Sequence, residues 1–400
     1  MPRDIATCGV SGIYRRQFLI CGLMALTGCA VKRDYSTFDP YNSTRIAFIS
    51  DKLYLKSKSC ADVSFSFSCV GVQKNIPEGQ EDVYTVQLDG NGEELLISNV
   101  FLKYFVWSPN GREAAYLARA DEDDSSKQAS IMLLDLKTKA HRSMGSFGNA
   151  SNLTFSPDGL YFAVPTKAGQ QSNDNEVAVV NTISAERTFI KGCNKYISWS
   201  PNGHKLLTYS DSTYEDFIKV SEAESLKWSE VARGYYPRWL DNDHIIFERE
   251  NKLCRINIST GMIDALDDQY FKLRSNILET PVPIPSPDGN KVAFLYSIGS
   301  PFSDHTPLGI YVLEVSTGKV YRLASVPPYV EVPASPPFTG TRWAFFPINS
   351  LSWSPDGDYI LYSTFFNMHV CRWDGSYTSQ IPMADGSRIH DAFWSPYLKI

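Results

Sequence analysis

The sequence predicts an all-β fold in which about seven four-stranded blades form a single ring, a β-propeller. Three observations support this prediction. A five-residue turn motif recurs at intervals of about one blade, short apolar strands flank each copy, and the two ends of the repeat region each hold only part of a unit. Repeats of roughly 40–50 residues are typical of propellers and other repeat arrays.

The recurring motif is an aromatic residue or proline followed by Ser-Pro-Asp/Asn-Gly. Proline presets the φ angle of a type I turn, aspartate or asparagine fits the next position, and glycine closes the turn. Residues 239–243, WLDND, are interpreted as a degenerate copy that divides the longest interval. The other copies are WSPNG at 107–111 and 199–203, FSPDG at 155–159, PSPDG at 285–289, WSPDG at 353–357 and the pair Ser395-Pro396.

Four short strands are expected to accompany each turn. A strand that ends in an aromatic residue precedes the turn, as in residues 196–199, and an apolar strand follows it, as in residues 205–209. Two further strands, such as residues 309–315 and 320–323, complete the unit. One blade cannot bury both of its faces, so each blade must pack against its neighbours.

The ends of the repeat region predict how the ring closes. The first unit begins with the strand at 44–50, which no Ser-Pro turn precedes, and the last unit stops after the strand at 389–395. We expect the C-terminal strand to join the N-terminal blade, because this removes the open sheet edges. Units 44–106 and 285–352 are long enough for extra strands, so the predicted number of blades lies between six and eight. The units begin at Arg45, Trp107, Phe155, Trp199, Trp239, Pro285 and Trp353.

Residues 1–28 have the composition of a signal peptide. Arg15 and Arg16 precede an apolar run over residues 18–26, which is too short to span a bilayer and is followed by small residues. Residues 26–29, LTGC, resemble the bacterial lipobox, which implies cleavage before Cys29 and acylation of its thiol, for example with palmitate. An ordinary signal peptide or a buried N-terminal helix is the alternative.

The predicted domains are therefore a lipoprotein signal peptide at 1–28, a lipidated tether at 29–43 and the propeller at 44–400. Residues 14–20, YRRQFLI, resemble the twin-arginine export motif, but Tyr14 and Ile20 depart from it, so the general secretory route stays open. In Gram-negative lipoproteins an aspartate after the acylated cysteine favours the inner membrane. This chain has Ala30 there, which favours the periplasmic face of the outer membrane.

Charge argues against nucleic acid as a partner. The net charge of the 400 residues is −6; residues 1–28 contribute +2, from three arginines and one aspartate, so the remainder carries −8. General nucleic-acid binding needs a basic face. The sequence leaves the oligomeric state and any small-molecule ligand open.

The cysteines and histidines predict no metal site and no cofactor. There is no CxxC pair, and no two histidines have metal-ligand spacing. Cys60 and Cys69 flank the segment SFSFS and are the candidate disulfide, which suits an oxidising compartment. Cys193, Cys254 and Cys371 are far apart in sequence and are predicted to be small buried hydrophobic residues.

The pattern aromatic-Ser-Pro-Asp/Asn-Gly-x-x-apolar-Ala/Leu is similar to the WD-related repeats of TolB-like propellers, over nearly all of residues 44–400. Prolyl-oligopeptidase-type peptidases carry related repeats, but their Gly-x-Ser-x-Gly motif is missing from this sequence. The resemblance implies a non-enzymatic scaffold that binds cell-envelope proteins across the propeller face. Fold alone does not determine function.

Residues 326–350 are the main candidate for partner binding, and residues 56–81 are the second. Prolines lower the ordering cost of a loop, and aromatic side chains supply contact area at low entropic cost. The alternative is that these aromatics cap the edge of their own blade. The candidate residues are Tyr329, Phe338, Trp343, Phe345 and Phe346.

A second class of function stays open from the sequence. The chain could bind a carbohydrate or cell-wall ligand, or be a propeller enzyme of the lyase or glycosidase type, with a site in the central funnel. Glycosidase chemistry needs two facing carboxylates. A funnel with such carboxylates would favour catalysis, whereas an exposed aromatic patch would favour protein binding.

Overall fold

The computed structural model describes most of the predicted propeller region. Within the described residues the chain forms strands and turns and no helix, which confirms the all-β class. All of them belong to one compact unit, Pro40–Ile400. The described residues are 45–50, 81–119, 128–148, 150, 152–167, 175–192, 196–209, 217–223, 227–250, 252–266, 283–297, 308–326, 329–333, 341–345, 348, 350–364, 367–383 and 389–396.

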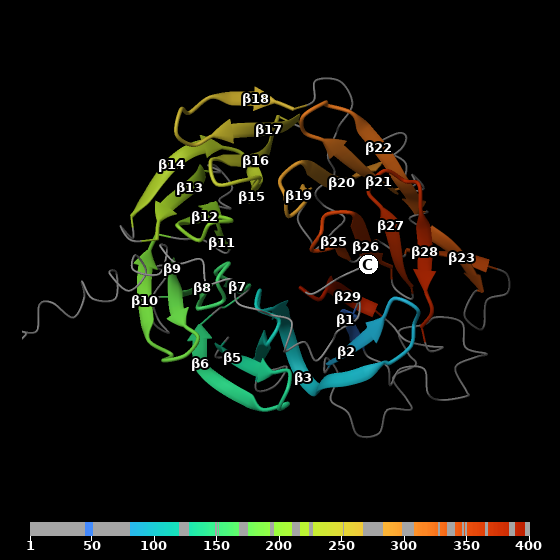
Figure 1. The fold of residues 1–400 in the computed structure, drawn as a ribbon, viewed down its shortest axis with the longest axis horizontal. Helices are drawn as coiled ribbons and strands as arrows, with labels where there is room; N and C mark the ends of the chain where they lie inside the picture. Colours follow the sequence, from blue (N-terminus) through green and yellow to red (C-terminus); the bar gives the residue numbers. More distant parts are fainter. Residues whose placement is uncertain are drawn as a thin grey trace, which may run out of the picture. The chain divides into compact units, whose positions relative to one another are not determined.

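The described residues form seven four-stranded antiparallel blades that follow one another around a central axis (Figure 1), as the repeats predict. The strand β3 passes from blade 1 into blade 2, so its first half pairs with β2 and its second half with β4. Blade 1 consists of β29 (Ile389–Trp394), β1 (Arg45–Ser50), β2 (Glu81–Gln87) and the first half of β3 (Glu94–Trp107); blade 2 of the rest of β3, β4 (Glu113–Arg119), β5 (Gln128–Asp135) and β6 (His141–Gly148); blade 3 of β7 (Thr154–Phe155), β8 (Tyr161–Lys167), β9 (Asn175–Asn181) and β10 (Arg187–Lys191).

The degenerate repeat at Trp239 also forms a complete blade, the fifth. Blade 4 consists of β11 (Ser198–Trp199), β12 (Lys205–Tyr209), β13 (Phe217–Glu222) and β14 (Trp228–Arg233); blade 5 of β15 (Tyr235–Trp239), β16 (His244–Arg249), β17 (Lys252–Asn257) and β18 (Ile263–Ala265); blade 6 of β19 (Ile284–Pro285), β20 (Lys291–Ser297), β21 (Leu308–Glu314) and β22 (Val320–Val326); blade 7 of β25 (Ser350–Trp353), β26 (Tyr359–Ser363), β27 (Met368–Arg372) and β28 (Thr378–Ile381).

The C-terminal strand β29 completes the N-terminal blade. It pairs antiparallel with β1, so that Phe393 lies opposite Ala47 and Ala392 opposite Phe48. Figure 1 shows β29 as the innermost strand of this blade, beside β1. The predicted closing strand is confirmed.

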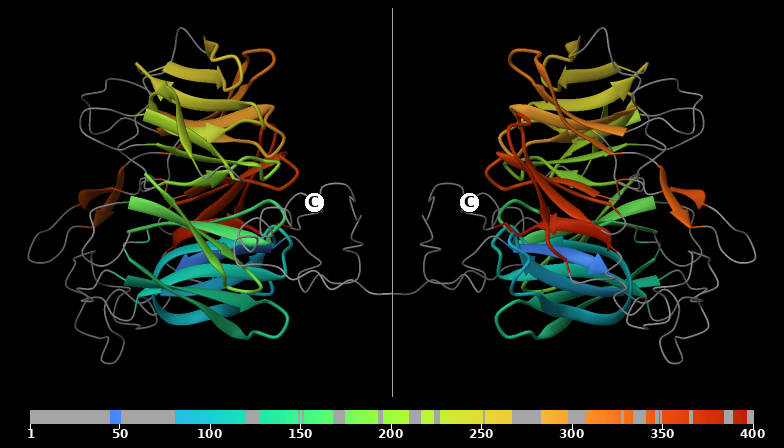
Figure 2. Two further views of the ribbon diagram at one scale, coloured as in Figure 1. Left: turned by 90° about the vertical axis from the view of Figure 1, so that its left-hand side faces the viewer. Right: turned by 90° about the vertical axis from the view of Figure 1, so that its right-hand side faces the viewer.

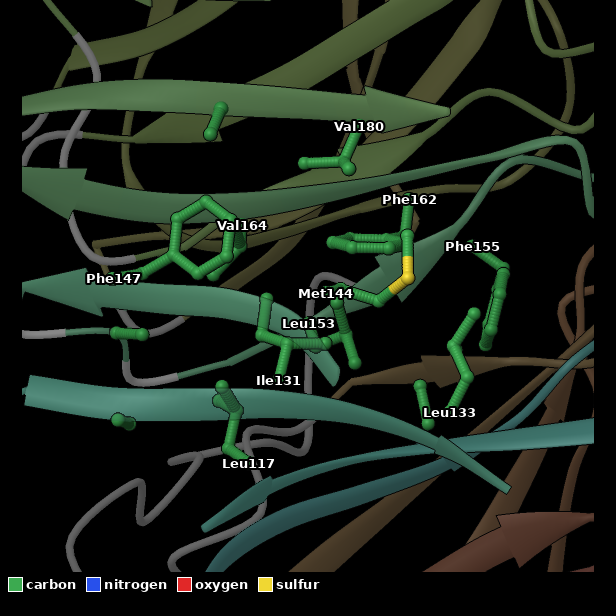
Figure 3. Close-up of a cluster of buried hydrophobic side chains, with 14 residues drawn as sticks. Leu117, Ile131, Leu133, Met144, Phe147, Leu153, Phe155, Phe162, Val164 and Val180 are labelled. Carbon is green, nitrogen blue, oxygen red and sulfur yellow. The ribbon is translucent and has the colours of Figure 1, made fainter. Parts of the chain in front are cut away.

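A buried apolar cluster lies at each of the seven junctions between neighbouring blades. At the junction of blades 7 and 1, Phe48 packs in a cluster with Leu361 and Met368. Figure 3 shows the junction of blades 2 and 3, where Met144 and Phe162 approach each other from the two sheets. Burying one such side chain contributes about 1.5–3 kcal/mol, so the stacking of the sheets holds the ring together. The other five clusters join the remaining neighbours in turn.

The Ser-Pro turns have the geometry that their residues predict. In blade 3 the amide of Gly159 donates to the carbonyl of Ser156 at 2.8 Å, and Gly159 has a φ of 70°, where glycine is favoured. The Ser156 hydroxyl donates to Asp158 at 2.5 Å and accepts from the amide of Tyr161 at 3.0 Å. Each residue type in the motif therefore makes a distinct hydrogen bond or fills a distinct backbone conformation.

The tryptophan before the turn joins neighbouring blades. In four blades its indole N–H donates to a backbone carbonyl on the inner strand of the preceding blade. This explains why the motif begins with tryptophan so often. The pairs are Trp199 to Thr154 at 3.3 Å, Trp239 to Ser198 at 3.4 Å, Trp353 to Ile284 at 2.9 Å and Trp394 to Ser352 at 3.0 Å.

An additional hairpin lies between blades 6 and 7. Its strands β23 (Tyr329–Pro333) and β24 (Thr341–Phe345) pair with each other and form a separate two-stranded sheet. Figure 2 shows this hairpin standing off one face of the stacked blades. Unit 285–352, which is long enough for extra strands, therefore contains two of them.

Several predictions concern residues outside the described ranges: the signal peptide and tether, Cys29, the pair Cys60 and Cys69, and Cys193. Cys254 and Cys371 are buried, as expected for small hydrophobic residues. Across the described ranges no helix is long and apolar enough to cross a membrane.

Candidate functional site

A pocket of about 350 Å³ lies between the inner strands of blades 3 to 6. Its lining includes the prolines of three Ser-Pro turns, Pro157, Pro201 and Pro287, so it reaches the face of the ring that carries these turns. Its walls include Phe155 and Trp199. Pockets lined by apolar and aromatic groups, with few polar groups, are typical ligand sites.

Arg238 is the one charged residue among the described residues that line the pocket. Its guanidinium carbon lies 4.3 Å from the ring centroid of Tyr196, and its Nη1 donates to the carbonyl of Pro237 at 2.9 Å. A guanidinium stacked on an aromatic face keeps its N–H edge available for planar acceptors. The pocket therefore presents an oriented cation to whatever enters it.

A group of tyrosines extends from Tyr196 toward the opposite face. Its ring centroid lies 5.8 Å from that of Tyr209, which lies 6.3 Å from that of Tyr236. The register of β15 is irregular between Tyr235 and Arg238, and Tyr236 has a φ of 52°, uncommon for a residue with a side chain. Irregularities of this kind re-aim side chains and are frequent near functional sites.

Tyr104 and Asp391 bring blades 2 and 1 into the same central region. Burial raises the pKa of Tyr104 to about 12; nearby Tyr196 and Asp391 also raise it, whereas the positive charge of Arg238 lowers it. The phenol of Tyr104 therefore stays protonated at neutral pH. Side chains from four blades thus act on one another near the axis of the ring.

The described lining of the pocket contains no carboxylate, so the pair of facing carboxylates that would favour glycosidase chemistry is not found there. No three histidine, cysteine, aspartate or glutamate side chains gather as a metal site within the ranges that the structure describes.

The binding residues predicted from the sequence lie elsewhere. Tyr329, Trp343 and Phe345 are in the β23–β24 hairpin, where Tyr329 is paired with Phe345 and Glu331 with Trp343. Residues opposite each other, and those two apart on one strand, share a face of a sheet, so three aromatic positions share one face of the hairpin. Phe338 and Phe346 lie outside the described ranges.

Arg238 and Tyr196 were not among the functional residues predicted from the sequence. A usable signal exists in the aligned repeats, because Arg238 directly precedes the aromatic residue that opens the motif. The other copies that line the pocket have an uncharged residue at this inner-strand position. These residues are Thr154, Ser198 and Ile284.

No protein-family model matches the chain, and no curated protein matches it. Solved structures do. TolB from Acinetobacter baumannii is 16% identical with a TM-score of 0.50, over 88% of this chain and 66% of TolB. An oligogalacturonate lyase solved in complex with manganese is 12% identical with a TM-score of 0.53, over 78% of this chain and 84% of the lyase.

A prolyl endopeptidase is also similar, with 11% identity and a TM-score of 0.52, over 78% of this chain and 46% of the peptidase. The chain thus spans just under two thirds of the length of the Acinetobacter TolB. Identities this low show the fold alone, and these proteins differ in function. The comparisons confirm that the chain has a β-propeller fold similar to that of TolB.

Proposed function

We propose that this protein is a non-enzymatic scaffold that binds other proteins in the bacterial cell envelope. A lipid on Cys29 would anchor it to the periplasmic face of the outer membrane. The LTGC sequence, the acidic propeller and the TolB-like fold support this proposal. The observation that carries it is the β23–β24 hairpin, which pairs with none of the blades in the described part of the chain.

The aromatic face of the hairpin suits protein binding. Tyr329, Trp343 and Phe345 share this face by their register, while Val330 and Ala344 share the other. Aromatic residues dominate the binding energy of many protein interfaces because they bury large areas with few rotatable bonds. A hairpin outside the blades can present them without any change in the ring.

Chain direction places the hairpin on the face opposite the Ser-Pro turns. In an antiparallel four-stranded blade the outer strand ends on the face where the inner strand begins. The hairpin connects the outer strand β22 to the inner strand β25, so it belongs to that face. The connection from β1 to β2, residues 51–80, begins and ends on the same face. The two long insertions are therefore joined to one side of the propeller.

Site-specific photo-crosslinking in cells tests the proposal. A photoreactive phenylalanine analogue is placed at Trp343 or Phe345, and at Ala344 as the matched control on the other face of the same strand. We expect adducts with one set of envelope proteins at positions 343 and 345 and few at 344. Equal adducts at all three positions, or none at any, would contradict an aromatic binding face.

The double variant Trp343→Ser, Phe345→Ser provides a second measurement. It should lose the crosslinked partners, tested with the photoreactive analogue at Tyr329, and keep the melting temperature of the parent chain. A large fall in melting temperature would instead show that these aromatics support the fold, which is the alternative that the sequence left open.

A further inference from the structure

Arg238 acts on the same Tyr104 phenol as the carboxylate of Asp391, but the two side chains form no ion pair. Arg238 forms no ion pair with any described residue, and its hydrogen bond to a described group is the one to the Pro237 carbonyl at 2.9 Å. A half-buried cation is costly unless it is paired, and a guanidinium has five N–H donors. The remaining donors and the charge favour an anionic group in the pocket.

The guanidinium is also held in place. It stacks on Tyr196 at 4.3 Å, and Tyr196 is in turn packed against Tyr209. The irregular stretch of β15 between Tyr235 and Arg238 sets where the side chain leaves the strand. Fixing a side chain before a ligand arrives lowers the entropy cost of binding.

The shape of the pocket limits what can enter. Its volume of about 350 Å³ lies near the lower end of the usual range for ligand pockets, about 300–1,000 Å³. Phe155, Trp199 and the prolines of the turns form walls that suit the faces of a compact ring. A planar carboxylate matches the fork of an arginine better than a point charge does.

We propose that this pocket binds a small molecule in which one carboxylate is carried by a compact ring, with Arg238 as the anchoring cation. The site reaches the turn face of the ring, whereas the hairpin belongs to the opposite face. The proposal therefore stands independently of the protein-binding role.

Binding of benzoate to the full chain, compared with binding of benzamide, tests the charge requirement. Benzamide has nearly the same shape and no negative charge. Ligand-observed NMR titrations should show binding of benzoate that is about tenfold tighter or more, as expected for a charge-assisted hydrogen-bonded pair. Equal affinities for the two compounds would overturn the proposal.

Substitutions of Arg238 test whether benzoate binds in the pocket at this residue. Arg238→Gln should remove the preference for benzoate, and Arg238→Lys should keep part of it. Arg233→Gln is the matched control, because Arg233 stacks on Phe217 at 4.5 Å at the outer strand of blade 4, outside the pocket. Unchanged benzoate binding in a folded Arg238→Gln or Arg238→Lys variant would contradict the assignment.

An acidic peptide tests whether the carboxylate that binds in the pocket belongs to a protein segment rather than to a small molecule. The probe is acetyl-Pro-Glu-Pro-amide, measured in the same titration. We expect it to bind more weakly than benzoate, because its carboxylate is on a flexible side chain. If it binds more tightly and depends on Arg238, the occupant is an acidic protein segment and the small-molecule proposal is wrong.

Discussion

The indole nitrogen of Trp394 lies 3.0 Å from the carbonyl oxygen of Ser352, which joins the last strand of the ring to the inner strand of blade 7. The same strand, β29, pairs with β1 at the other end of the repeat region. Trp394 therefore belongs to the contact that unites both ends of the propeller. Any change there acts on ring closure directly.

Trp394→Phe should lower the free energy of unfolding, because it removes the indole donor and leaves the Ser352 carbonyl without this hydrogen bond. Trp228→Phe is the matched control, since the buried indole N–H of Trp228 has no hydrogen-bond partner among the described residues. We expect the first variant to lose about 1 kcal/mol more than the second in denaturant titrations. Equal losses would contradict a stabilising role for the inter-blade hydrogen bond.

Gly289→Ala should destabilise the protein far more than Gly318→Ala. Both glycines have a φ near 70°, so both substitutions carry the same backbone strain, about 1 kcal/mol. A Cβ at Gly289 would overlap the carbonyl oxygen of Leu240 in blade 5, whereas a Cβ at Gly318 would meet no atom within 4 Å. Thermal melts of the two variants measure the difference. Similar losses would argue against close contact between the turn of blade 6 and blade 5.

Glu248→Gln should stabilise the protein at neutral pH. Glu248 is 8% exposed, its Oε2 has no hydrogen-bond partner among the described residues, and burial raises its pKa above the usual 4.5. At pH values between the pKa of Glu248 in the unfolded chain and its higher pKa in the folded chain, the folded chain holds the proton more tightly than the unfolded chain does. The free energy of unfolding therefore falls as pH rises through this range, and the full cost is present at neutral pH.

Melting curves at two pH values test the direction of this pH dependence. The gain from Glu248→Gln should be largest near pH 7 and should shrink below pH 4.5, where both states are protonated. Glu250→Gln, at an exposed neighbouring position, is the control and should change little. A gain of the same size at both pH values would mean that the charge of Glu248 is not its source.

Cys29→Ala should release the protein from the membrane fraction and abolish palmitate labelling, because the acylated thiol is lost. Cys21→Ala, within the predicted signal peptide, should leave both unchanged. Fractionation and labelling of the three chains in parallel measure this. Continued labelling of the Cys29→Ala variant would show that the lipobox interpretation is wrong.

The ring could be predicted because a short sequence motif marks each of its blades. A Ser-Pro-Asp/Asn-Gly turn specifies its own backbone, so each copy marks one blade even where the flanking residues vary. The degenerate copy at Trp239 was harder, because Leu240 replaces the serine; there Asp241 accepts from the amide of His244 at 2.8 Å instead. The turn in blade 5 therefore forms without the serine, through other hydrogen bonds.

The pocket could not be predicted in the same way. Arg238 and Tyr196 are 42 positions apart and meet only because blades 4 and 5 are neighbours. Which side chain of a repeat faces the axis depends on the irregular pairing of β15, for which the sequence gives no direct sign. The strand β3, which is shared by blades 1 and 2, could not be predicted either, because no local motif marks its continuity.

Removal of the closing strand β29 shows whether the two ends of the repeat region close the ring. A chain that ends at residue 388 lacks β29, and a chain that ends at residue 396 keeps it. We expect the shorter chain to lose cooperative thermal unfolding and a synthetic peptide of residues 389–396 to restore it, while the longer chain melts like the parent. Identical cooperative melts of all three chains would contradict a ring closed by its two ends.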